Sequence, residues 1–341
     1  MRIFLFLMMI FFIGCQKKEK KIPVVLGFTS NYSMVAKDIK NGMLLAQDEE
    51  NNIKFKFIDN KGNVTYTKQI DKKFINKTPL IVGHITSTIT KEVVPLFNNT
   101  NTILFSPTAS TKELSNIDDN FIRIQSVKDF KNIEHILQYI RQFSIKNINI
   151  IYDVKNESYA HSLISLLLDK RNIYLKVNKI VPVSFDNMDL KDIDFNTPVY
   201  IIGSAKLSAK IVKYLKKHKF DCLIFVSGSA FTKYFINLTG DDGEGVVFFS
   251  TFNPDSDNKK YLKFKEKFIS KFGYEPGSFE VKGYETAKII SQVIDKKNIK
   301  NALINHTFEG LQGKIYIDKY GDTIRKTHIY IINNGIFEKV K

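Results

Sequence analysis

The feature that most constrains this chain is an alternation of two kinds of segment along almost its whole length. Short apolar runs rich in Val, Ile and Phe, such as residues 24–28 and 80–83, are separated by longer stretches in which apolar residues recur with a helical period. Strands that alternate with helices are typical of parallel βαβ units. The pattern occurs twice, and 341 residues exceed what one core usually organises. We therefore expect an α/β protein with two doubly wound, parallel-sheet lobes.

The same alternation predicts the individual elements. The first half predicts strands at 24–28, 53–58, 80–83 and 102–105 and helices at 35–50, 67–75 and 88–97, with the run 121–124 leaving the sheet. The second half predicts strands at 149–152, 199–202, 222–226 and 245–249 and helices at 130–143, 159–168, around 211–215, 261–272 and 284–294. Near the C-terminus, alternating residues surround Asn333, Asn334 and Gly335, which predicts a β-hairpin.

The N-terminus carries an export signal. Met1 and Arg2 precede an apolar run over residues 3–13, which is too short to span a membrane and is typical of a secretory signal. Residues 12–15 resemble a bacterial lipobox, so we expect residues 1–14 to be a signal peptide and Cys15 to be lipidated. The alternative is an ordinary signal peptide in which Cys15 is incidental. Residues 15–21 are polar and predict a solvated tether. Together, the export signal and the lipid anchor lead us to expect the protein on the periplasmic or cell-surface side of a bacterial membrane.

The cysteines and the distribution of charge argue against two further classes, a disulfide-stapled protein and a nucleic-acid-binding protein. Cys222 is the only other cysteine and lies in an apolar run, so we expect a small buried residue and no intrachain disulfide. The net charge of +16 raises the question of nucleic-acid binding. However, the lysines are spread along the chain and alternate with acidic residues, which indicates solvated helix faces. We expect no nucleic-acid partner.

Two hydroxyl-rich segments directly follow predicted strands of the first half. They are residues 83–90 and residues 106–111. Ligands of open α/β sheets bind beyond the carboxyl ends of the strands, and hydroxyl and backbone N–H groups suit a carboxylate there. Helix capping by Ser and Thr explains either segment without a ligand. The presence of both favours a binding site.

Several short motifs occur in an order and spacing that a known family shares. They are residues 41–46, Asp59, residues 83–87, residues 106–110 with 114–115, residues 243–245, Phe264, residues 272–273, Pro276, residues 283–285, residues 313–315, Asp318 and residues 321–322. Through these motifs the chain resembles the type I periplasmic solute-binding proteins of the branched-chain amino-acid transporter family. The resemblance runs from Val25 nearly to the C-terminus.

The resemblance implies two lobes that are joined by three crossovers and close over a ligand. We expect lobe 1 to comprise residues 22–124 and 252–324, and lobe 2 to comprise residues 125–251 and 325–341. The expected function is capture of a small polar ligand and its delivery to the membrane permease of an ABC transporter. The expected protein is a monomer, anchored to the bilayer through Cys15.

The resemblance also implies site residues. Ser87, Thr108 and Ser110 would hold a ligand carboxylate, Ile85 would flank the ligand, and Tyr159 would approach from lobe 2. Thr88 and Ala109 belong to the same two loops and are included in the expected site. The family's amino-acid binders place an acidic residue where this chain has Ser227 and Ser229, which we also include. An amino acid, another small carboxylate, an amide or a urea-like solute therefore all remain open as ligands.

We expect neither an enzyme nor a cofactor. The six histidines show no metal-ligand spacing, and no nucleophile elbow or phosphate-binding glycine motif occurs. His84 lies next to the expected site and is interpreted as a hydrogen-bonded loop residue, while Asp241, Asp242 and Glu244 are interpreted as turn residues. The alternative function is a ligand-sensing or protein-interaction lipoprotein on the same fold.

Overall fold

The computed structural model describes residues 20–127, 130–170 and 172–340. The predicted signal peptide and Cys15 lie outside the described residues. Across the described ranges, no helix combines the length and apolar character needed to cross a bilayer.

Lobe 1 takes its elements from two stretches of the chain. They are β1 (Lys20–Leu26), α1 (Ser33–Asp48), β2 (Ile53–Asp59), α2 (Val64–Lys72), β3 (Leu80–Val82), α3 (Ser87–Val93), β4 (Ile103–Ser106) and β5 (Phe121–Arg123), then α9 (Ser278–Val293), α10 (Ile299–Leu303), β11 (His306–Gly310) and β12 (Gly313–Ile317).

Lobe 2 takes its elements from the middle and the end of the chain. They are α4 (Phe130–Arg141), β6 (Asn147–Asp153), α5 (Glu157–Leu167), β7 (Lys176–Val183), β8 (Val199–Ile202), α6 (Ala205–Lys217), β9 (Ile224–Ser227), α7 (Lys233–Thr239), β10 (Val247–Ser250), β13 (His328–Asn333) and β14 (Ile336–Lys339). Helix α8 (Lys259–Phe272) follows β10 on the way back to lobe 1.

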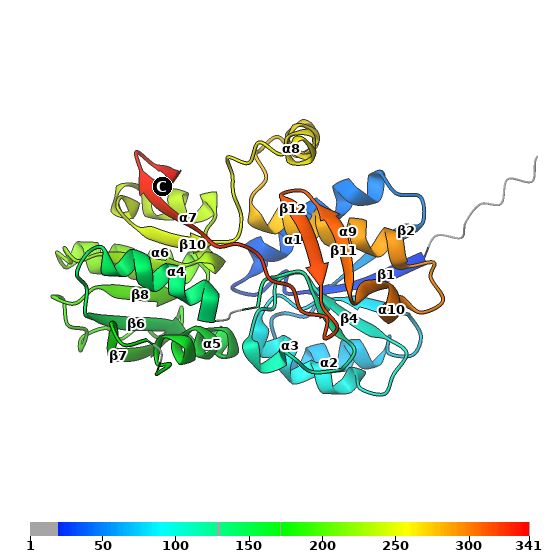
Figure 1. Ribbon diagram of the computed structural model, residues 1–341, viewed down its shortest axis with the longest axis horizontal. Coiled ribbons are helices and arrows are strands. Elements are labelled where there is room, and N and C mark those ends of the chain that lie inside the picture. The colour runs from blue at the N-terminus through cyan, green and yellow to red at the C-terminus, as the bar shows by residue number, and fades with distance from the viewer. Residues whose placement is uncertain (1–19, 128–129, 171, 341) are drawn as a thin grey trace, which may run out of the picture.

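The two lobes lie end to end along the long axis of the molecule (Figure 1). The lobe-1 sheet has five parallel strands in the order β2-β1-β3-β4-β5. The lobe-2 sheet has the order β14-β13-β10-β9-β8-β6-β7, in which β13 is antiparallel to both β10 and β14. The chain crosses between the sheets after β5, after β10 and between β12 and β13. The expected fold of two α/β lobes joined by three crossovers is confirmed.

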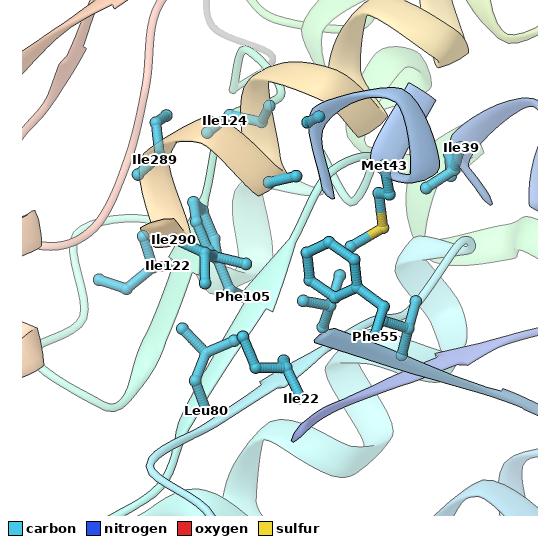
Figure 2. Close-up of a cluster of buried hydrophobic side chains, with 14 of the residues drawn as sticks. Ile22, Ile39, Met43, Phe55, Leu80, Phe105, Ile122, Ile124, Ile289 and Ile290 are labelled. Atoms are coloured by element: carbon cyan, nitrogen blue, oxygen red, sulfur yellow. The ribbon is translucent and has the colours of Figure 1, made fainter. Parts of the chain in front are cut away.

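The lobe-1 core forms where α1 and α9 cover one face of the sheet. Figure 2 shows Met43 of α1 and Ile290 of α9 above side chains of the strands, and all of these side chains are buried. Two glycines let the helices approach closely: a Cβ at Gly42 would lie 2.0 Å from the carbonyl oxygen of Glu280, and one at Gly283 would lie 2.2 Å from that of Ile39. Any larger residue would push the helices apart. This close packing places the start of α9 beside the lobe interface.

The structure corrects two expectations about individual segments and adds elements that the sequence did not predict. Residues 121–124 do not leave the sheet, because β5 pairs in parallel with β4 as an edge strand. The edge strand β7 and the hairpin β11–β12 were not expected from the sequence. Cys222 precedes β9 and is only half-buried, with its thiol donating to the carbonyl of Phe195 at 3.4 Å. The C-terminal hairpin is confirmed, with Asn334 and Gly335 both at positive φ in the turn between β13 and β14.

Candidate ligand-binding site

A cavity lies between the lobes, where the carboxyl ends of strands from both sheets meet. Lobe 1 and the first crossover contribute Tyr32, Val35, Ile85, Ser87, Thr108, Ser110, Gln125, Ser278, Phe279 and Lys282. Lobe 2 and the second crossover contribute Asn156, Tyr159, Gly228, Ser229, Phe249, Ser250 and Thr251. This is the position at which open α/β sheets bind ligands.

The lobe-1 wall is formed by the loops that follow β3 and β4. The backbone N–H of Ser110 donates to Oγ of Ser87 at 3.1 Å, so the two loops are joined at the cavity. The Thr108 hydroxyl donates to the carbonyl of Ile85 at 2.9 Å. Because the Ser87 oxygen accepts a bond, its own proton can be donated to a ligand.

A buried ion pair supports these loops from behind. The Nε of Arg123 donates to Asp322 at 2.8 Å, and its two terminal nitrogens donate to the carbonyl of Thr111 and the hydroxyl of Ser115, each at 2.7 Å. Burial lowers the pKa of Arg123 from its ordinary value, and Asp322 opposes that shift. The guanidinium therefore fixes the end of the second loop.

His84 does not face the cavity. Its Nε2 lies 2.9 Å from Asp71 Oδ2 and its Nδ1 lies 3.1 Å from the carbonyl oxygen of Val25, and the side chain is fully buried. Both ring nitrogens are therefore engaged within lobe 1. The interpretation of His84 as a hydrogen-bonded loop residue is confirmed.

The lobe-2 wall carries hydroxyl groups that bond to one another. The oxygens of Ser227 and Ser229 lie 2.8 Å apart, and Ser229 donates to the carbonyl of Gly203 at 2.8 Å. Burial raises the pKa of Tyr159, while hydrogen bonds to Ser227 and Ser229 lower it. This cluster is neutral, and its members satisfy one another.

Direct bonds also join the two walls around the cavity. The Tyr32 hydroxyl donates to Asp153 at 2.9 Å, and the backbone N–H of Ser158 donates to the hydroxyl of Thr88 at 3.1 Å. Burial, and then the neighbouring Asp153, raise the pKa of Tyr32 well above its ordinary value. Burial also raises the pKa of Asp153. The lobes are therefore in contact in this conformation.

Most of the expected site residues come together, but three lie off the cavity wall. Ile85, Ser87, Thr108, Ser110, Tyr159 and Ser229 line the cavity. Thr88 bonds across the lobe interface instead. Ala109 is fully buried in the core of lobe 1 and donates its N–H to Ser106, and Ser227 is fully buried next to Ser229.

Tyr32, Gln125 and Lys282 also line the cavity and were not predicted from the sequence. Lys282 is 7% exposed, and its ammonium lies 4.9 Å from the centroid of the Phe279 ring. The predicted helix at 284–294 begins after Lys282, whereas α9 begins at Ser278 and places Lys282 among its buried residues. Across residues 20–127, 130–170 and 172–340, no group of three or more His, Cys, Asp or Glu could hold a metal ion.

Comparison with known proteins identifies the class to which this fold and cleft correspond. A family model described as "Receptor family ligand binding region" matches residues 40–334. The chain belongs to this family, whose members have the type I periplasmic binding fold and are ligand-binding proteins, not enzymes. No curated protein matches the chain in sequence.

Solved structures share the fold at low sequence identity. The leucine-binding protein LivK of Thermotoga maritima is 20% identical, with a TM-score of 0.84 over 94% of this chain and 97% of that chain. LivJ of Streptococcus pneumoniae, in complex with isoleucine, is 18% identical, with a TM-score of 0.82 over 95% and 99% of the two chains. A solute-binding protein of R. palustris, in complex with benzoate, is 15% identical, with a TM-score of 0.83 over 94% and 95%.

Proposed function

We propose that this protein is an extracytoplasmic solute-binding lipoprotein that captures a small polar ligand between its lobes and delivers it to an ABC permease. The observation that carries the proposal is the interlobe cavity, which is lined by Ser87 and Ser110 from lobe 1 and by Tyr159 from lobe 2. A ligand that touches both walls favours the closed form through its higher affinity for that form.

The structural neighbours support a small carboxylate or an amino acid as the ligand. They are a leucine-binding protein, a complex with isoleucine and a complex with benzoate, and all of these ligands carry a carboxylate. Ser87 and Ser110 line the cavity of this chain, and their hydroxyl groups are the donors that we propose for a ligand carboxylate. Charge-assisted hydrogen bonds of this kind contribute about 1.5–3 kcal/mol each.

A thermal-shift screen of the purified chain over amino acids, amides and small carboxylates tests this function. A ligand at about 100 times its Kd should raise the free energy of unfolding by about 2.7 kcal/mol, and this gain should grow with the logarithm of the ligand concentration. Mass spectrometry of the purified protein should find the same compound. If no compound in the screen raises the Tm and none co-purifies, capture of a small solute is wrong and the protein-interaction function gains support.

The lipid anchor is tested separately at Cys15. We expect Cys15→Ser to remain unlipidated and uncut before residue 15, because the thiol is the group that is modified. Mass spectrometry of the N-terminus and fractionation of membranes would detect the change. A variant that is still processed and still retained on the membrane would contradict the anchor.

A further inference from the structure

A second cavity adjoins the ligand cavity at the lobe interface. Tyr32 and Ile85 line both cavities, so the two are adjacent. Lobe 1 contributes the turns that follow β1 and β2, around Ser30 and Asn60, and lobe 2 contributes Lys155, which follows β6. Both lobes therefore form the wall of the second cavity, as they do for the first.

The lobe-1 wall of the second cavity is a closely held turn after β2. Asp59 Oδ1 accepts the N–H of Lys61 at 2.9 Å, and Asp59 Oδ2 accepts from the Thr29 hydroxyl at 2.6 Å, so the turns after β1 and β2 are joined. Gly62 has a φ of 64°, and a Cβ there would lie 2.6 Å from the Cβ of Ser30. Glycine is therefore required at this position.

Asn60 lines this cavity with a buried amide group. Its side chain is 1% exposed, and its Oδ1 accepts the N–H of Gly62 at 3.0 Å. That bond fixes the orientation of the amide, because a flipped side chain would set an NH2 group against an N–H group. Its Nδ2 has no hydrogen-bond partner among residues 20–127, 130–170 and 172–340. A buried N–H group without an acceptor is costly, and an oxygen of a bound group would satisfy it.

The charge at the second cavity is positive on both sides. Of the described residues that line it, Lys61 from lobe 1 and Lys155 from lobe 2 are charged, and none is acidic. Asp59 and Asp153 lie next to the two turns, but they accept hydrogen bonds from hydroxyl and backbone N–H groups and do not line the cavity. The Lys61 ammonium lies 5.2 Å from the centroid of the Tyr66 ring, which carries no charge of its own. Cations on both sides and a buried N–H donor favour an anionic oxygen and disfavour an ammonium group.

We propose that the second cavity is a subsite for an anionic, oxygen-bearing group, namely a carboxylate or a phosphate. Asn60 Nδ2 donates to this group, and Lys61 and Lys155 attract it from opposite lobes. The group is either the distal end of a ligand whose carboxylate lies in the first cavity or a separate small anion. In both cases it contacts both lobes and favours the closed form. This inference rests on the proposed function of the cleft, whose closure brings the two lysines together.

Three kinds of probe distinguish the two sources of the anion. Dicarboxylates from succinate to pimelate are compared with the monocarboxylates of the same length and with their own monoamides, and inorganic phosphate is titrated alone, by calorimetry on the full chain. If the ligand carries the group, at least one dicarboxylate should bind at least about tenfold more tightly than both partners, which is the gain from one charge-assisted hydrogen bond. If the anion is separate, phosphate should bind on its own and add to the binding of a monocarboxylate.

A variant of Asn60 assigns the group to the second cavity. Asn60→Asp keeps the acceptor for the Gly62 N–H and replaces the unused donor by a negative charge. It should weaken binding of the preferred dicarboxylate or of phosphate at least about tenfold. A monocarboxylate, which occupies only the first cavity, should keep its affinity. The Tm of the variant without ligand establishes that it is folded.

Lysine variants test the charge at the subsite. Lys61→Met and Lys155→Met should each weaken binding of the anionic probe about threefold, as expected for exposed charges. The exposed lysines Lys314 in lobe 1 and Lys217 in lobe 2 provide matched controls, because Lys314→Met and Lys217→Met change the net charge by the same amount and should leave binding unchanged.

The outcomes separate this inference from the proposed function. If no dicarboxylate exceeds both its partners and phosphate does not bind, or if Asn60→Asp binds the probe normally, the second subsite is wrong, and binding of any other solute preserves the function of the cleft. Equal losses in the control lysine variants would show general attraction to a basic protein and would also overturn the subsite. If neither these probes nor any compound of the wider screen binds, the proposed function fails as well.

Discussion

The two walls of the cleft occupy equivalent positions in their lobes, yet they are held in different ways. The lobe-1 loops after β3 and β4 are supported by ionised or titratable groups, namely Arg123 with Asp322 and His84 with Asp71. The lobe-2 turn after β9 is held by the neutral pair Ser227 and Ser229. Because its supports lie behind the loops, lobe 1 leaves hydroxyl groups facing the cavity. In lobe 2 the hydroxyl groups bond to one another.

This difference suggests that the two walls have different roles in ligand binding. Lobe 1 would bind the charged end of the ligand with preorganised donors, and lobe 2 would supply a closing surface formed by Tyr159 and Phe249. Loss of a support in lobe 1 should therefore be more costly than loss of a hydroxyl in lobe 2. The following predictions test that contrast.

The largest effect is expected at Arg123. Arg123→Met removes a fully buried guanidinium and leaves Asp322, which is 6% exposed, without its main partner. Breaking a buried ion pair in this way costs about 3–5 kcal/mol. Urea denaturation would measure the loss. Arg123→Lys should recover only part of it, because an ammonium cannot reach all three acceptors.

The lobe-2 counterpart is Ser229→Ala, which removes one neutral hydrogen-bonding group. We expect it to cost about 0.5–1.5 kcal/mol, the usual contribution of such a bond. Equal losses for Arg123→Met and Ser229→Ala would remove the contrast between the two walls.

The next effect concerns ligand binding at the lobe-1 wall. Ser87→Ala removes a donor to the ligand and the acceptor of the Ser110 N–H, so we expect binding to weaken by about 1–3 kcal/mol. Ser110→Ala removes only a hydroxyl and should have an effect at the lower end of that range. Titration calorimetry with the ligand found in the screen would measure both changes.

A matched control for these variants is Ser208→Ala in lobe 2. Ser208 is fully buried on α6, and its hydroxyl has no hydrogen-bond partner among the described residues. It is not part of the cavity lining. Normal affinity in Ser87→Ala, or an equal loss in Ser208→Ala, would contradict the role of the loop hydroxyls.

The parts of the molecule that the sequence predicts well are those that follow clear apolar strands. The lobe-1 loops were predicted because the rule for open α/β sheets fixes them at the ends of apolar strands that are themselves easy to identify. The strand β7 was missed because its first half contains Lys and Asn, and its apolar second half is interrupted by Pro182, which weakens the strand pattern. The prediction that residues 121–124 leave the sheet was wrong. They include the edge strand β5, whose three residues are too few to show a pattern that reveals the pairing with β4.

The rest of the site depends on contacts that the sequence does not encode locally. Gln125 and Lys282 reach the cavity from a crossover and from a helix more than 150 residues further along the chain. Thr88 and Ala109 are adjacent to cavity residues, but the Thr88 hydroxyl bonds to Ser158 across the lobe interface and Ala109 packs in the lobe-1 core. Sequence patterns therefore located the loops and could not give the direction of each side chain.

A further prediction uses the pH dependence of lobe 1. Asp38 of α1 lies beside Glu280 of α9, and burial followed by the charge of Glu280 raises the pKa of Asp38 to about 8. The folded chain thus holds a proton between about pH 4 and pH 8 that the unfolded chain releases, so stability falls as the pH rises through this window. One pKa unit corresponds to about 1.4 kcal/mol, and we expect a loss of at least about 1 kcal/mol between pH 5 and pH 8.

Asp38→Asn tests this origin, because the amide keeps a donor for Glu280 and does not titrate. The difference in unfolding free energy between pH 5 and pH 8 should shrink in this variant, as measured by urea denaturation at both values. An unchanged pH profile would show that the pair does not control it.

The smallest effect, with the opposite sign, is expected in lobe 2. Burial, followed by the charges of Lys339 and Lys326, lowers the pKa of His328 on β13 to about 4. Between about pH 6.5 and pH 4 the unfolded chain therefore binds a proton that the folded chain does not, and stability falls as the pH falls through this window. His328→Gln should flatten this acidic side of the profile and leave the alkaline side, which depends on Asp38, unchanged. If His328→Gln instead alters the profile between pH 7 and pH 8, the two lobes do not titrate independently, and the assignment of the acidic side of the profile to His328 is wrong.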